Sequence, residues 1–233
     1  MLGTLVEARM SLYDFNTLYS CFGRLVVWAA LVPVAIISIR FLLRKQWKRA
    51  VKLCAVFGAA ALTLWGGEYL LYRIDHALYL SKIFDTNVGF GRPIYEYDSP
   101  RSFHGDGYSI TVYQLPDSIR SRFASFDETL ESDFPKKQGY RKDWHTQHWK
   151  VGPIPKEDLK YMRFACGFYS GGKPPAKLKN SVREFREALK SDPVYYSFFY
   201  SRLSDDKHDY WGDIDFFMID PKTSRVYIIN HNT

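Results

Sequence analysis

Residues 25–43 read LVVWAALVPVAIISIRFLL, and residues 51–72 read VKLCAVFGAAALTLWGGEYLLY. Both stretches are apolar around the whole circumference of a helix, so neither has a polar face to turn toward water. As helices rising about 1.5 Å per residue they are about 28 and 33 Å long, against a bilayer hydrocarbon core of about 30 Å. A buried hairpin in a soluble protein is the alternative, but we expect two membrane-spanning helices.

The charges around these stretches predict how they are oriented. The connection between them is basic and has no acidic residue; it contains Arg40, Arg44, Lys45, Lys48, Arg49 and Lys52. In the preceding tail, Arg9 and Arg24 are offset by Glu7 and Asp14. Because loops rich in Lys and Arg stay in the cytoplasm, we expect both termini to lie outside it. The chain has no Asn-x-Ser/Thr acceptor, which favours a bacterium over a eukaryotic secretory route. Together with the two apolar stretches, this predicts a protein that crosses a bacterial inner (plasma) membrane twice.

The net charge of +7 is concentrated in the apolar part of the chain. Residues 1–84 have ten Lys and Arg against four Asp and Glu, whereas residues 85–233 have twenty-two against twenty-one. A nucleic-acid-binding protein is expected to carry its excess positive charge on its folded domain. The sequence therefore predicts the lipid bilayer as a partner and no nucleic acid. Three cysteines also exclude a small scaffold held together by disulfides.

Beyond residue 84 the periodicity changes from helical to mixed. Turn residues at 85–92 place a boundary between a membrane-anchoring region, 1–84, and an extracytoplasmic domain, 85–233. Alternating or β-rich runs predict strands at 107–115, 194–200, 213–219 and 225–230, the last two joined by a turn at 220–224. Helical patterns occur at 117–124, 156–164 and 181–190. This order predicts an α+β fold with a mainly antiparallel sheet and a few helices, following a two-helix transmembrane hairpin.

The string His104-Gly-Asp-Gly107 precedes the first clear strand. His104 and Asp106 are candidate binding residues, because a loop that presents an imidazole and a carboxylate can act as an acid/base pair or hold a metal. The alternative is a glycine-supported turn in which Asp106 bonds to nearby backbone. We favour the turn.

The segment 144–149, WHTQHW, places two histidines between two tryptophans. On a helix, His145 and His148 would share a face and, with His104, hold zinc. Neither an HExxH nor a CxxC pattern accompanies them. We favour an exposed aromatic and histidine segment at a binding or membrane-proximal surface, with Trp144 and Trp149 as its apolar contacts.

The HGDG string, the strand GYSITVYQLP at 107–116 and the terminal hairpin IDFFMIDPKTSRVYII at 214–229 together resemble a loose group of short bacterial membrane-anchored proteins. That group is functionally uncharacterised. The likeness covers about residues 102–231 and implies the topology of the domain, but no activity.

No Walker loop, nucleophile elbow or dinucleotide fingerprint occurs in the sequence, so we assign no catalytic residue, metal or cofactor. The leading hypothesis is a membrane-anchored extracytoplasmic binding protein with a protein partner, one form of which is immunity to an envelope-acting toxin. The alternatives are an accessory subunit of a membrane complex and a metal-dependent envelope hydrolase that uses His104, Asp106 and His145 or His148.

Overall fold

The computed structural model describes residues 12–87, 91–102, 106–137, 143–167, 174–201 and 212–233. The chain divides into two compact units, Met1–His76 and Ala77–Thr233. This division lies eight residues before the boundary expected from the sequence, because the last turns of the second helix belong to the core of the C-terminal unit. There Leu80, Ile83 and Phe84 are almost completely buried.

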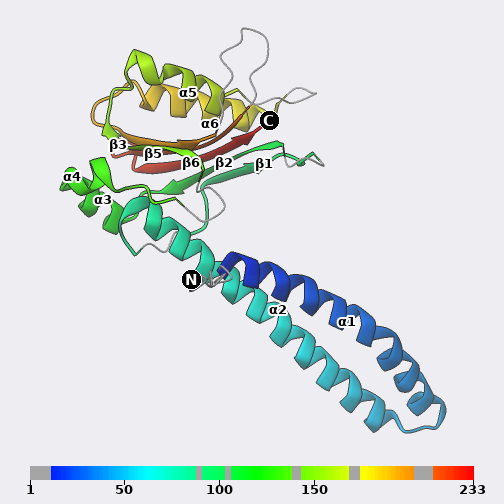
Figure 1. Cartoon of the computed structure of the whole chain (residues 1–233). Coiled ribbons are helices and arrows are strands. Elements are labelled where there is room, and N and C mark those ends of the chain that lie inside the picture. The colour runs from blue at the N-terminus through cyan, green and yellow to red at the C-terminus, as the bar shows by residue number, and fades with distance from the viewer. Residues whose placement is uncertain (1–11, 88–90, 103–105, 138–142, 168–173, 202–211) are drawn as a thin grey trace, which may run out of the picture. The chain divides into compact units, whose positions relative to one another are not determined.

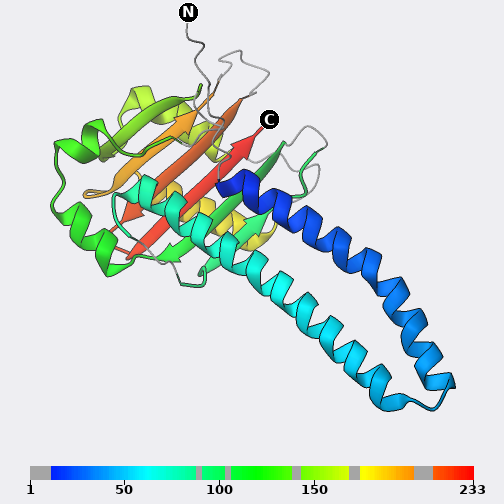
Figure 2. The same ribbon diagram turned by 60° about the horizontal axis from the view of Figure 1, so that its bottom comes forward.

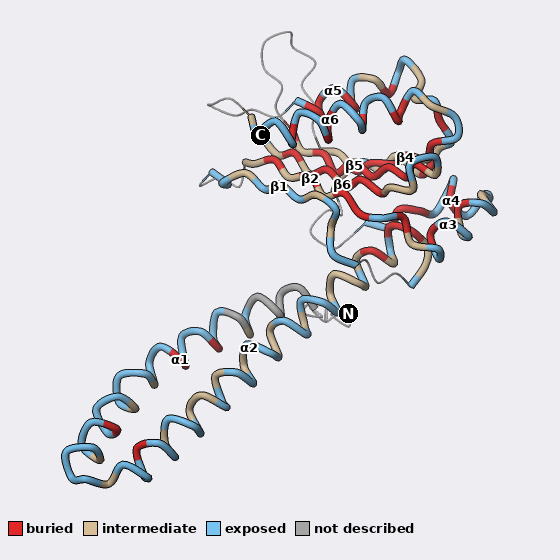
Figure 3. The backbone as a smooth tube through the Cα atoms, turned by 180° about the vertical axis from the view of Figure 1, so that it is seen from behind, coloured by how far each residue is buried: buried red, intermediate tan, exposed pale blue. Residues whose placement is uncertain are grey.

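The N-terminal unit consists of helix α1 (Leu12–Leu43) and the first part of helix α2 (Trp47–Phe84). Lys45 adopts a left-handed conformation in the tight connection between them, which ends α1. Only 6% of the apolar window in each helix is buried. All but two of the exposed large hydrophobic residues in the described ranges lie on these helices, and the exceptions are Ile94 and Val151. Both helices are long and apolar enough to cross a membrane, and most of their described residues are exposed or half-buried (Figure 3).

The C-terminal unit combines one sheet with short helices. Its strands are β1 (Tyr95–Asp98), β2 (Gly107–Gln114), β3 (His145–Val151), β4 (Tyr195–Tyr200), β5 (Asp213–Asp220) and β6 (Arg225–Asn232). Its helices after α2 are α3 (Asp117–Ala124), α4 (Glu128–Ser132), η2 (Lys156–Asp158), α5 (Leu159–Ala165) and α6 (Ala176–Ala188). The strand order is β1-β2-β6-β5-β4-β3 and every pairing is antiparallel, which confirms the expected α+β class.

Helices cover both faces of this sheet, so the unit has two hydrophobic cores (Figure 1). Under α5 and α6, side chains such as Tyr196, Phe216 and Phe185 form the first core. On the other face, the end of α2 lies with α3 and α4 over residues that include Phe199 and Phe217 (Figure 2). Alternate residues of β4 and β5 point into opposite cores, as the period of two in a strand requires.

The predicted strands at 107–115, 194–200, 213–219 and 225–230 are confirmed as β2, β4, β5 and β6. The predicted turn joins β5 to β6, where the Asp220 carboxylate accepts hydrogen bonds from the Lys222 N–H (3.0 Å) and the Thr223 hydroxyl (2.6 Å). The expected start of the last helix at 181 is wrong. Helix α6 begins at Ala176, directly after Pro175, and Leu178 extends its buried face by one turn.

Candidate functional site

Asp106 lies directly before β2 and is hydrogen-bonded to Ser102, which follows β1 in the chain. Its carboxylate accepts a hydrogen bond from the Ser102 hydroxyl (2.8 Å), and the Ser102 N–H donates to the carbonyl oxygen of Asp106 (2.9 Å). The Asp106 N–H in turn donates to the Ser102 hydroxyl (3.1 Å). These reciprocal bonds are those of a turn-forming aspartate. His104, the other candidate in this string, lies outside the described residues.

The segment that contains His145 and His148 is strand β3, not a helix. The His145 ring stacks on Tyr200, which packs against the core under α5 and α6, with ring centroids 5.0 Å apart. His148 Nδ1 lies 3.0 Å from the carbonyl oxygen of Phe134, a residue of the opposite core, and must donate because a carbonyl only accepts. The two imidazoles therefore contact different sides of the sheet, so the helical face proposed for zinc does not exist.

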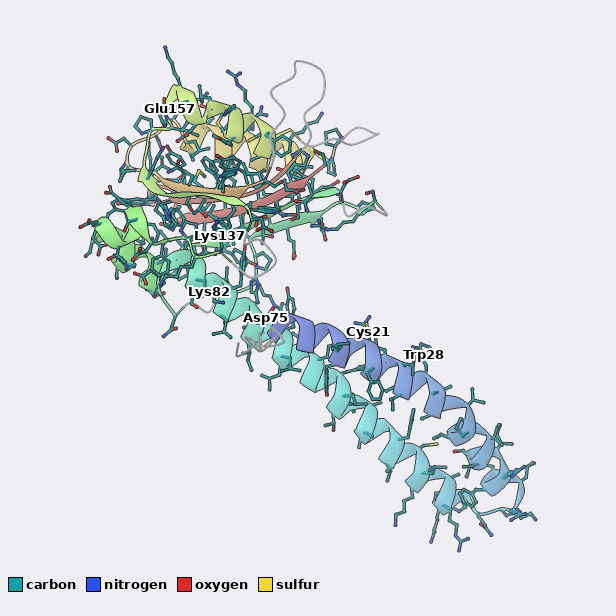
Figure 4. All side chains as sticks on the ribbon, viewed as in Figure 1. Cys21, Trp28, Asp75, Lys82, Lys137 and Glu157 are labelled. Carbon is teal, nitrogen blue, oxygen red and sulfur yellow. The ribbon has the colours of Figure 1, made fainter. Side chains whose placement is uncertain are left out.

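The two tryptophans that flank these histidines differ in exposure. Trp149 is only 1% exposed and packs between Phe84 and Phe123, with ring centroids 5.6 and 4.7 Å away. The expectation that it contributes to an exposed surface is wrong, because β3 turns this side chain into the core beside α2. Trp144 is half-buried against the same core, and its carbonyl oxygen accepts a hydrogen bond from Lys137 at 2.6 Å. Lys137 is labelled in Figure 4.

The predicted site residues that the structure describes thus do not converge. Asp106 is hydrogen-bonded to Ser102, His145 and His148 are held by separate contacts, and Trp149 belongs to the core. Among the described residues, no group of three or more His, Cys, Asp or Glu side chains is placed to hold a metal ion.

A different surface has the properties of a binding site. An open groove of about 650 Å³ lies along α5 and α6, on the outer side of the helix layer. Its buried floor includes Met162, Cys166 and Val182. Five basic side chains line it: Arg163, Lys179, Arg183, Arg186 and Lys190. We call this surface the α5–α6 groove.

The positive charge of the α5–α6 groove is only weakly neutralised. Within the described part of the chain, only Lys190 of the five basic residues forms an ion pair, with Glu187 at 3.1 Å, and both side chains are about two-thirds exposed. Ion pairs between such exposed side chains contribute little free energy, so this pair holds Lys190 only weakly. The other acidic residue on α6, Glu184, is engaged by Arg225 of β6. The guanidinium groups of Arg163, Arg183 and Arg186 face solvent without a carboxylate partner among the described residues.

Cys166 is the one potential nucleophile on the floor of the α5–α6 groove. It is 2% exposed, and burial raises the pKa of its thiol to about 11, although the nearby Arg186 guanidinium acts in the opposite direction. A thiol with such a pKa is almost entirely protonated at neutral pH, so it is a poor nucleophile. What the described lining of this groove offers a ligand is therefore positive charge rather than a reactive thiol.

The charge of the C-terminal unit is unevenly distributed among its helices. Residues 127–133, around α4, include Asp127, Glu128, Glu131 and Asp133 and no basic residue. The basic helices α5 and α6 cover the other face of the sheet (Figure 1). The near-neutral total found from the sequence hides this distribution. A signal was present in the spacing of Lys179, Arg183 and Arg186, which are four and then three residues apart and so lie on one side of a helix.

Comparisons with known proteins add no relative from which a function can be transferred. The chain matches no protein-family model, no curated protein and no solved structure.

Proposed function

We propose that the protein is a membrane-anchored binding protein whose C-terminal unit binds a protein or another envelope component outside the cytoplasm. In this proposal α1 and α2 cross a bacterial inner membrane twice, with the basic 44–52 connection in the cytoplasm. The observation that carries the anchor is the concentration of exposed large apolar side chains on these two helices. In water this surface would favour aggregation, whereas lipid tails solvate it.

Side chains near the ends of the two apolar stretches support a bilayer as their solvent. Trp28, Trp47 and Trp65 are exposed aromatic residues of the kind that anchor helices at a membrane interface. Arg24 donates a hydrogen bond to Glu68 at 2.7 Å, so the charges that flank the first stretch and end the second are paired. Pairing lowers the cost of placing both groups beside hydrocarbon.

The α5–α6 groove supports binding as the role of the C-terminal unit. It combines an excess of positive charge with a recessed apolar floor, which together provide both attraction and contact area. The raised pKa of Cys166 speaks against thiol catalysis there. Neutralising an envelope-acting toxin, as an immunity protein does, is one form that such binding takes. The resemblance of this region to bacterial membrane-anchored proteins is consistent with an envelope location.

A second candidate function, an accessory subunit of a membrane complex, is favoured by one observation in the N-terminal unit. An open, mainly apolar cleft of about 580 Å³ lies between α1 and α2 and is lined by residues that include Val27, Trp28 and Trp65. A helix of a neighbouring membrane protein would fill such a cleft. Under this function the N-terminal unit, not the α5–α6 groove, makes the essential contact.

Site-specific photo-crosslinking of the full chain in its own cells tests the proposal. A photoreactive residue replaces Arg183 in the α5–α6 groove, Glu131 on α4 or Gln114 at the end of β2, all of which are exposed. We expect one partner to crosslink in near-stoichiometric yield at position 183 and much less at the two control positions. If none of the three positions gives a reproducible adduct while position 28 in the α1–α2 cleft does, the accessory-subunit function replaces the proposal.

A further inference from the structure

We infer that the α5–α6 groove binds an acidic polypeptide segment, one in which carboxylates alternate with apolar side chains. This inference rests on the proposed binding function and adds the chemistry of the partner. It is drawn from the arrangement of positive charge around an apolar floor.

Four of the five basic residues form a row on the α6 rim of the groove, and the fifth lies on the α5 rim. Lys179, Arg183 and Arg186 follow one side of α6 over about 10 Å, at a rise of 1.5 Å per residue. Lys190 comes just after the end of α6, and Arg163 projects from α5. An extended or helical segment that lies along the groove would meet successive positive groups on the α6 side and Arg163 on the α5 side. The length of the row therefore fits a peptide segment better than a single small anion.

The residue types on the rims favour carboxylates as the recognised groups. Three of the five basic residues are arginines, whose planar guanidinium donates two parallel hydrogen bonds to one carboxylate. Arg186 is already oriented, because one of its N–H groups donates to the backbone carbonyl oxygen of Cys166 at 3.3 Å. Arg183 is held similarly by the side-chain oxygen of Asn180 at 3.2 Å. Side chains positioned in advance lose less entropy on binding.

The floor of the groove explains why the segment should also carry apolar residues. Met162 and Val182 are 8% and 4% exposed, so each keeps a small apolar surface at the bottom of a polar cleft. An apolar side chain between two carboxylates would cover this surface while the carboxylates reach the rims. Methionine adapts to the shapes of different partners, which suits a recognition surface.

The same observations disfavour two other anionic partners. A helix layer that binds to a lipid surface carries exposed large hydrophobic residues beside its basic ones. None of the exposed large hydrophobic residues in the described ranges lies on α5 or α6. Single-stranded nucleic acid binds where bases stack on aromatic side chains, and none of the described residues that line the groove is aromatic.

The test measures binding of a defined probe to the full chain in nanodiscs of neutral phosphatidylcholine. The probe is a fluorescein-labelled peptide of alternating Glu and Leu, and its matched control replaces every Glu with Gln. We expect saturable binding of the Glu peptide alone, weakened about tenfold between about 50 mM and about 200 mM salt, because exposed charges are screened over that range. The double variant Arg183→Glu/Arg186→Glu should bind the Glu peptide at least about tenfold more weakly, because each substitution replaces attraction with repulsion.

A second variant separates the groove from the total charge of the protein. Lys136→Glu/Lys222→Glu changes the net charge equally but alters exposed residues outside α5 and α6, and it should bind as the wild-type chain does. Near-ultraviolet circular dichroism verifies that each variant keeps its packed core, and Arg183→Gln/Arg186→Gln replaces the reversal variant if that one does not fold.

Several results would overturn the inference. One is that the groove variant binds the Glu peptide as tightly as the wild-type chain does. Another is that the matched charge variant loses as much affinity for the peptide as the groove variant does. The third is that inorganic phosphate, phosphatidylglycerol vesicles or single-stranded DNA displaces the labelled peptide as well as the unlabelled peptide does. Sedimentation that shows groove-dependent self-association would instead identify a second copy, presenting its acidic α4 region, as the occupant. If the peptide fails to bind while crosslinking at position 183 yields a partner, the proposed function stands and only the acidic chemistry is wrong.

Discussion

The indole N–H of Trp149 donates a hydrogen bond to the backbone carbonyl oxygen of Ile83, 2.9 Å away. This bond joins β3 to the last turn of α2, where the helix carbonyls no longer have partners within the helix. Asp85 follows in a left-handed conformation, and its carboxylate accepts a hydrogen bond from Arg122 of α3 at 2.8 Å. The end of α2 is therefore fixed within the C-terminal unit by side chains of two other elements.

Replacement of Trp149 should test this role directly. Trp149→Phe keeps an aromatic ring but leaves the Ile83 carbonyl without its donor, and we expect it to lower the free energy of unfolding by about 1–3 kcal/mol. Trp149→Ala also leaves a cavity and should cost about 3–5 kcal/mol. Chemical denaturation of the detergent-solubilised full chain, followed by tryptophan fluorescence, gives both values. An effect of Trp149→Ala below about 1 kcal/mol would mean that the indole is not part of the core.

His231 should make the C-terminal unit less stable in mild acid. It is 3% exposed, stacks on Phe164 and donates through Nδ1 to the Phe164 carbonyl oxygen (2.8 Å); its burial lowers the pKa of the imidazole below the ordinary value. As the pH falls below about 6.5, His231 binds a proton in the unfolded chain but stays neutral in the folded chain. The free energy of unfolding therefore decreases.

A His231→Phe variant isolates this contribution from the other groups that titrate. It keeps the stacking on Phe164 but cannot take up a proton. We expect it to be less stable than the wild-type chain at about pH 7.5, with the difference shrinking toward about pH 5.5 as the wild type loses its advantage. A difference that is constant across this range, measured by thermal unfolding, would show that His231 does not titrate with an altered pKa.

Cys166 should be unreactive in the folded protein. With a pKa of about 11 and 2% exposure, its thiol has neither the thiolate form nor the access that alkylation requires. In a Cys21→Ala/Cys54→Ala chain, a maleimide at neutral pH should label Cys166 at least about a hundredfold more slowly than in denaturant. Labelling at the same rate in both conditions would show that the floor of the α5–α6 groove is open.

The ion pair between Arg24 and Glu68 should be coupled energetically. Their side chains are 63% and 24% exposed within the structure, but in the proposed membrane hydrocarbon and headgroups replace water around them. A double-mutant cycle with Arg24→Leu and Glu68→Leu should give a coupling of at least about 1 kcal/mol, and the swap Arg24→Glu/Glu68→Arg should recover part of it. Thermal loss of helical circular dichroism in detergent is the measurement. Strict additivity of the two single effects would contradict the pairing.

The sequence predicted the larger features of this fold and missed those that depend on tertiary contacts. The apolar runs at 25–43 and 51–72 and the alternation at 107–115 are signals carried by the local chain, and they correspond to α1, α2 and β2. Strand β3 has the polar sequence HTQHWKV and a register shift between Gln147 and Lys150, so it lacks a regular alternation. Strand β1 is only four residues long. Both are edge strands that pair with one neighbour.

The candidate site was harder to predict than the fold. His145 and His148 attract attention in the sequence because histidine is a common metal ligand, yet whether such side chains converge depends on the register of β3 against β4. The α5–α6 groove depends on how two consecutive helices pack side by side, and its charge is masked in the total by acidic residues elsewhere in the unit. A sum over the sequence does not reveal which face of a domain carries a charge.

The side of the membrane on which the C-terminal unit lies tests the central claim most directly. The claim is that α1 and α2 hold this unit outside the cytoplasm. Two fusions are made after Thr233 of the full chain, one to alkaline phosphatase and one to green fluorescent protein. Alkaline phosphatase folds only in an oxidising compartment. Extraction of the membranes with alkaline carbonate then shows whether each fusion stays in the membrane. We predict an active phosphatase fusion, a dark fluorescent protein fusion and retention of both in the membrane pellet. Fluorescence without phosphatase activity, or release of the chain into the supernatant, would contradict the account.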